Sequence, residues 1–127
     1  MRSIMRLFLI GFAGFVGTIV RYWLSGTVAR RYGETFPLGT LVVNLVGCFF
    51  VGLFYCLMQE RYLVNQTVRS IVLIGLLGGF TTFSSFGLQT FTLLRDQEIT
   101  LALLYMVSSN VLGVILVWVG YSLARTL

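Results

Sequence analysis

The sequence contains no histidine and only two cysteines in 127 residues, and these absences exclude several kinds of site. Most metal-ligand sets and most nucleophile pairs of hydrolytic enzymes need histidine or several cysteines. Cys48 and Cys56 are eight positions apart, which is about 12 Å along a helix and too far for a mutual disulfide. Both are therefore expected to be small buried residues.

Acidic residues are also scarce, and all four fall at the ends of apolar segments or between them: Glu34, Glu60, Asp96 and Glu98. A proton-coupled transporter normally keeps an ionisable group inside the membrane, and this chain offers only Arg21. No acid, base and nucleophile share one plausible cavity, so an enzyme is not expected. A small proton-coupled exporter of drugs or cations stays open as an alternative, because such exporters are also short four-helix chains that pair antiparallel. A helical membrane scaffold is the non-transport alternative.

Apolar residues make up 57% of the chain and charged residues only 10%, which is the composition of a membrane protein. About 20 apolar residues are enough to cross the hydrocarbon core of a bilayer. We expect an all-α membrane protein with one domain over residues 1–127 and four spanning helices, near residues 1–26, 36–60, 68–95 and 98–126. Arg21 interrupts the first span, so we expect it near a membrane interface with Trp23 as an aromatic anchor.

The nine basic residues, all arginines, are divided almost evenly between the two sides of the predicted membrane domain. Five lie on the side of the termini and the second loop, and four on the side of the first and third loops. Because an Arg/Lys excess in short loops sets orientation, this balance favours insertion in both orientations and an antiparallel homodimer. The alternatives are that Arg21 is miscounted or that another signal sets orientation. The arginines flank lipid-spanning segments without interleaved aromatics, so nucleic acid is not an expected partner.

Neutral polar residues occur inside the second and fourth spans. In GTLVVNLVG, Thr40 and Asn44 are four positions apart and share a helix face. The Asn44 amide offers two N–H donors to an anion, although a purely structural role between helices is the alternative. Tyr105 and Ser109 share a face in the same way, although a serine can instead bond its own backbone.

The third span contains the stretch that least favours a helix, GLLGGFTTFSSFGLQ at residues 75–89. Glycine is a poor helix former, and Thr and Ser compete for backbone hydrogen bonds. We expect the helix to break here, at the centre of the membrane, where a break exposes carbonyls to a cation and N–H groups to an anion. Phe83 and Phe86 could present their partly positive ring edges to a small anion, and ordinary packing is the alternative.

Three segments together resemble the Fluc/CrcB family of fluoride channels: Gly17 to Leu24 with Arg21, GTLVVNLVG, and GLLGGFTTFSSF. The resemblance covers essentially the whole chain, and the GGxTTFSxF core is quite specific. It implies a small multi-pass protein of the bacterial inner membrane that exports fluoride passively and so relieves fluoride toxicity. It further implies an antiparallel dual-topology homodimer with two pores and a structural Na⁺ at its centre.

The same resemblance implies roles for individual residues. The implied pore and anion-binding residues are Asn44, Phe83, Phe86, Thr40, Ser84, Tyr105, Ser109 and Arg21. The backbone carbonyls of Gly78 and Thr81 would hold Na⁺. Some family members carry a hydroxyl where this chain has Gly113 and an acid where it has Gln89, so the exact polar track stays open.

We expect copies of this chain to occur in the membrane in both orientations, because the arginine count gives no clear direction of insertion. A cysteine introduced at one terminus should react with an impermeant thiol reagent applied from either side of the membrane. Labelling from one side alone would contradict the prediction.

Overall fold

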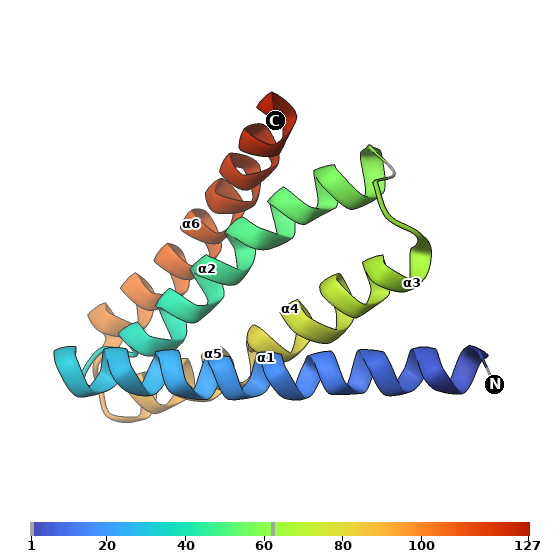
Figure 1. Ribbon diagram of the computed structural model, residues 1–127. Helices are drawn as coiled ribbons and strands as arrows, with labels where there is room; N and C mark the ends of the chain where they lie inside the picture. The colour runs from blue at the N-terminus through green and yellow to red at the C-terminus, as the bar shows by residue number, and fades with distance from the viewer. Residues whose placement is uncertain (1, 62) are drawn as a thin grey trace.

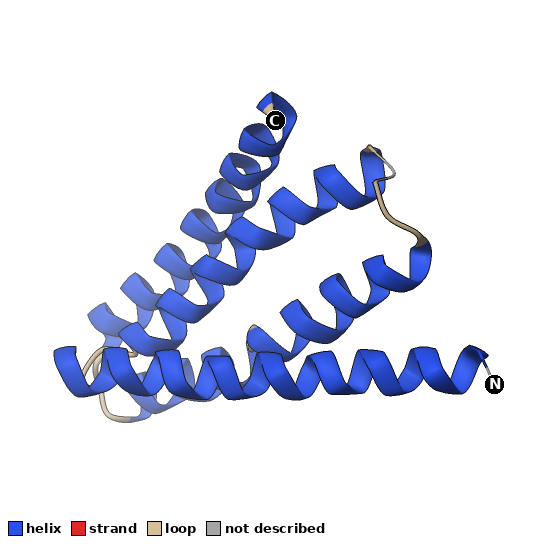
Figure 2. Cartoon of the chain, viewed as in Figure 1, coloured by secondary structure: helices blue, strands red, loops and turns tan. Residues whose placement is uncertain are grey.

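The computed structural model describes residues 2–61 and 63–127, and this part of the chain consists of helices joined by short turns (Figures 1 and 2). Within it, four helical spans are long and apolar enough to cross a membrane, as predicted. The first is α1 (Arg2–Tyr32), and the last is α6 (Ile99–Thr126). The second is α2 (Leu38–Phe54) with the wider turns of η1 (Tyr55–Glu60), and the third is α3 (Gln66–Arg69), η2 (Ser70–Leu76), α4 (Leu77–Phe80) and α5 (Phe83–Arg95).

The first helix is longer than predicted, because the segment expected to be a loop from about residue 27 continues as helix to Tyr32. The Thr27 hydroxyl bonds the Trp23 carbonyl inside the helix at 2.8 Å, and two arginines in the last turn suit its negative end. Gly33 ends the helix with a φ of 83°, and its N–H donates to the Ala29 carbonyl. Only residues 33–37 are left to turn the chain into α2.

The third span is broken within the predicted stretch. Thr81 and Thr82 have extended backbone between α4 and α5. The N–H and the hydroxyl of Thr81 both donate to the Leu77 carbonyl at 3.0 Å, which closes α4. The Thr82 hydroxyl accepts the Ser85 N–H at 3.2 Å, which caps the start of α5. The two threonines therefore end one helix and begin the next.

The helices pack as two pairs that diverge towards the chain termini (Figure 1). In one pair, α2 and α6 run side by side in the same direction. In the other, α1 lies along η2 and α4. A small buried cluster of Leu41, Leu93, Ala102 and Tyr105 forms the core, while many large apolar side chains of α1 and α6 are exposed, as expected for surfaces that meet lipid or a second copy.

Glycines let the helix backbones approach closely in both pairs. A Cβ added to Gly52 or Gly120 would meet backbone across the α2–α6 pair, and one added to Gly17 or Gly79 would meet backbone across the contact between α1 and the third span. The Thr18 hydroxyl donates to the Gly79 carbonyl at 3.4 Å. The end of α4, and with it the break, is therefore held directly against α1.

Candidate functional site

Asn44 of α2 holds the break in the third span. Its Oδ1 accepts the Thr82 N–H at 2.8 Å, and its Nδ2 donates to the Thr82 carbonyl at 3.0 Å. These two bonds satisfy both backbone groups of a residue at membrane depth that lies outside any helix. One of the two amide N–H groups predicted to be available to an anion is therefore engaged, and one is left. Asn44 therefore has a structural role between α2 and the third span, which was the alternative to anion binding in the sequence analysis.

A polar cleft of about 240 Å³, here the inner cleft, adjoins the break. Its lining residues are Thr18, Arg21, Tyr22, Ser25, Thr40, Val43, Thr82 and Ser85. Six of these eight carry a hydroxyl, one is an arginine, and none is a carboxylate. The Thr18, Ser25 and Thr82 hydroxyls already donate to protein acceptors. The Arg21 guanidinium and the remaining hydroxyls of the lining are the donors left for an anion, and no carboxylate of the lining opposes it.

Arg21 lies further from the end of α1 than predicted. It lines the inner cleft together with Thr82 and Ser85 at the break, and α1 continues about three turns beyond it to Tyr32. The end of α1 was predicted too early, and the position of Arg21 relative to a membrane interface stays a prediction. A cation at this depth normally faces a polar cavity and marks a functional site, and the inner cleft is such a cavity.

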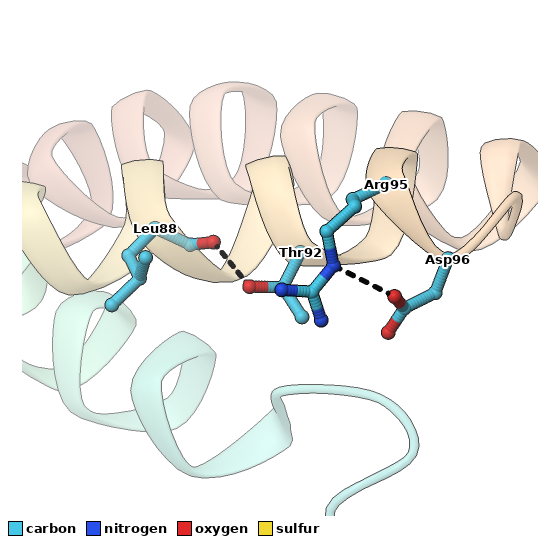
Figure 3. A network of polar contacts seen from close by, with 4 residues as sticks. All are labelled: Leu88, Thr92, Arg95 and Asp96. Atoms are coloured by element: carbon cyan, nitrogen blue, oxygen red, sulfur yellow. Dashed lines mark hydrogen bonds and ion pairs between the residues drawn. The ribbon is translucent and has the colours of Figure 1, made fainter.

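A larger cleft of about 710 Å³, here the outer cleft, opens at the end of the molecule that carries the first and third loops. One wall is a face of α5, where the Thr92 hydroxyl donates to the Leu88 carbonyl at 2.9 Å (Figure 3). Beside it, the Arg95 Nε donates to the Asp96 carboxylate at 3.0 Å, and both side chains are exposed. The two clefts share Ser25 and Thr40 in their linings, so they adjoin. Together they form a polar route from the loops to the break.

Four aromatic rings form a continuous row that reaches the outer cleft at Phe36, and the other three rings line neither cleft. The ring centroids of Phe83 and Phe86 are 5.7 Å apart, and Phe86 and Tyr105 are 5.2 Å apart. Phe36 meets Tyr105 edge-on at 5.6 Å. The buried Tyr105 hydroxyl donates to the Gln89 side-chain oxygen at 2.8 Å, so it is already engaged. The two phenylalanines singled out from their spacing are thus in contact, and Phe83 is 84% exposed.

The remaining predicted residues differ in their surroundings. The Ser109 hydroxyl oxygen is buried and has no hydrogen-bond partner in the part of the chain that the structure describes. Ser84 is exposed at the start of α5. In a continuous helix the Gly78 carbonyl would accept the Thr82 N–H, but Asn44 takes that donor, so the carbonyl is released from this bond.

The released carbonyl bears on a cation site. Gly78 lies within α4 and is exposed, and Thr81, which directly follows α4, is half-buried. No group of three His, Cys, Asp or Glu side chains within residues 2–61 and 63–127 could hold a metal ion. The released Gly78 carbonyl is a group of the kind that binds a hard cation.

Sequence reasoning missed most of the inner cleft. Thr18, Ser25, Thr82 and Ser85 line it but were not singled out. A signal was present for the first two, because positions 18, 21, 22 and 25 follow helical spacing and place hydroxyls on the face of Arg21. The other two needed the break geometry, which sequence spacing does not give.

Comparison with known proteins identifies the relatives of this chain. The model of the family described as CrcB-like protein, Camphor Resistance (CrcB), matches residues 8–121. A protein of Aquifex aeolicus named fluoride-specific ion channel FluC is 40% identical over 121 residues, which cover 95% of this chain and 98% of that protein. Proteins of the same name from Opitutus terrae and Nitrosococcus oceani are 52% and 43% identical, over 88% and 91% of this chain and 86% and 93% of their own lengths.

The Asn44 contacts predict a stability effect. Replacing Asn44 with alanine leaves the N–H and carbonyl of Thr82 without these partners in a partly buried place. We expect the free energy of unfolding to fall by about 1–3 kcal/mol. In the control Asn110→Ala, the lost bond goes only to the Met106 carbonyl on the same exposed helix face, and the change should stay within about 0.5 kcal/mol. Unfolding in mixed detergent micelles measures both, and equal effects would contradict the prediction.

Proposed function

The chain belongs to the CrcB-like family, and from this premise we propose that it is a fluoride-selective passive channel that lets fluoride leave the cytoplasm. The named relatives are ion channels, so the chain is not an enzyme. The observation that carries the proposal for this chain is the inner cleft, which combines six hydroxyl-bearing residues and Arg21 without a carboxylate next to a helix break.

Fluoride is small and strongly hydrated, so a path through the membrane must replace the lost water with donors. The second amide N–H of Asn44, the hydroxyls that line the inner cleft, such as Thr40, and the unpartnered Ser109 hydroxyl are such donors. Arg21 adds a positive charge where the inner cleft meets the break. Donors of this kind stabilise an anion, and the absence of a carboxylate from the lining spares it repulsion.

The row of aromatic rings gives the path its weak binding sites. Phe83 and Phe86 lie one turn apart on α5, and their ring edges carry partial positive charge. Ring edges attract an anion less strongly than a fixed cation does. An ion bound in this way leaves again, which conduction requires.

A passive path is sufficient for fluoride export from a bacterial cell. In an acidic medium fluoride crosses the lipid as its neutral conjugate acid and is trapped inside as the anion, which the membrane potential then drives outward. The carboxylates of the described chain that line either cleft, Glu34, Asp96 and Glu98, lie at the loop end of the outer cleft. This arrangement suits a channel of the inner membrane better than a proton-coupled exporter, which needs an ionisable group at depth.

The proposal includes an antiparallel homodimer of copies with opposite orientation. The exposed Phe83 and the exposed Gly78 at the break are surfaces that a second copy would cover. The Gly78 and Thr81 carbonyls of both copies would then hold a structural Na⁺. The bond that the Gly78 carbonyl loses at the break supports this assignment.

Flux from liposomes tests the function. Purified protein should release fluoride rapidly from loaded vesicles when a cation ionophore balances the charge, because the path needs no coupled ion. Chloride release should be far slower, and a pH gradient should not change the rate. Fluoride loss no faster than from protein-free vesicles would reject the channel, and cation movement driven by a pH gradient would support the exporter instead.

Two variants test the pore residues. Phe83→Ile removes a ring edge, and Asn44→Asp replaces a donor with a carboxylate that repels anions, so each should abolish fluoride flux. Phe91→Ile is the matched control, because Phe91 is an exposed α5 phenylalanine outside the ring contacts of Phe83 and Phe86. Size-exclusion chromatography should show Phe83→Ile and Phe91→Ile assembled like the wild type. Asn44→Asp also loses the donor to the Thr82 carbonyl, so its loss of flux is assigned to the pore only if it elutes as assembled protein. Unchanged flux in an assembled variant would remove that residue from the pore.

A further inference from the structure

Cys48 extends a polar face of α2 that begins with Thr40 and Asn44. The three residues are spaced four apart, so they form one stripe along the helix. Cys48 is half-buried, whereas Cys56, two turns further along, is 1% exposed. The two cysteines of this chain therefore have different surroundings, and the expectation that both are simply buried holds only for Cys56.

The packing of α6 on α2 shows what faces this stripe. A Cβ added to Gly113 of α6 would lie 3.4 Å from the Cys48 sulfur, and one added to Gly52 of α2 would meet the Val117 backbone. Both pairs are 65 positions apart in the sequence. Because the helices run in the same direction, each α2 residue of the stripe lies level with the α6 residue 65 positions later.

This register puts Asn44 level with Ser109, one turn before Cys48 and Gly113. The Ser109 hydroxyl oxygen is buried and lacks a hydrogen-bond partner within residues 2–61 and 63–127. Buried hydroxyls are normally paired, so an unpaired one points to a ligand that it meets in function. Asn44 also keeps one amide N–H beyond its bond to Thr82. Two donors, the second Asn44 amide N–H and the Ser109 hydroxyl, thus lie one helical turn before the Cys48 thiol and have no partner among the described residues.

We propose that Cys48 lines the anion path as the next donor after Asn44 and Ser109, and that it is the site at which a small thiol reagent blocks the protein. This inference rests on the proposed channel function. Gly113 contributes no side chain at this level, so the neutral thiol is the polar group present between α2 and α6 there. A thiol is a weak donor, which suits an ion that must move on.

Methyl methanethiosulfonate, a small neutral reagent, is the probe. The Cys48 thiol loses its proton to solvent, and the thiolate attacks the sulfenyl sulfur to form a Cys48–S–S–CH₃ disulfide. Methanesulfinate leaves with the electron pair of the broken S–S bond, so no further oxidant is needed. The added methylthio group would fill the space beside Gly113 and obstruct the path.

Fluoride flux from liposomes should fall by roughly tenfold or more after treatment of the wild type, which is the loss expected when a path of single-ion width is filled. Cys56→Ala should conduct normally and be blocked to the same extent, because Cys56 is buried and lies two turns beyond Cys48 on the helix. Cys48→Ser keeps a donor and should conduct without being blocked. Cys48→Val, which removes the donor at similar size, should reduce flux by roughly threefold.

Mass spectrometry of the treated protein makes the outcomes distinct. Labelling of Cys48 together with loss of flux supports the proposal. Full labelling of Cys48 with unchanged flux overturns it, and so does a Cys48 that reacts only after denaturation. If untreated protein passes no fluoride while Cys48 still reacts selectively, the proposed channel function is rejected. The conclusion that the reagent reaches Cys48 but not Cys56 is kept in that case.

Discussion

The pair of hydrogen bonds between the Asn44 carboxamide and the Thr82 backbone is the interaction on which the rest of the structure depends. Lipid supplies no partner for a peptide group outside a helix, so a break at membrane depth persists only where the protein provides both a donor and an acceptor. A primary amide provides both from one side chain. With that requirement met by α2, the third span can change direction and open its backbone.

Close backbone packing then determines where this open backbone lies. Glycines hold the end of α4 against α1, and the same contact brings Arg21 and the α1 hydroxyls alongside Thr82. The inner cleft is thus a product of two helix contacts, one made by glycines and one by Asn44. A guanidinium at this depth is tolerated because the cleft surrounds it with hydroxyls.

The sequence predicted what local composition decides. Four apolar spans and the break at the glycine and threonine stretch follow from length and propensity, and the structure has both. The predicted end of α1 was wrong, because the arginines of its last turn were taken for part of a loop. The partner of Asn44 lies 38 positions away, and only the tertiary packing reveals it. The roles of the pore residues and of a sodium ion stay predictions.

One amide that secures the fold and also faces the proposed path has an evolutionary consequence. A mutation at position 44 that changes ion preference also disturbs the backbone at the break. We therefore expect few substitutions to be tolerated at this position. Ser25 is under no such restriction, because its hydroxyl bonds only the Tyr22 carbonyl of its own helix while lining both clefts. Adaptation to a different anion would therefore begin at such hydroxyl positions, where chemistry can vary while the architecture is inherited unchanged.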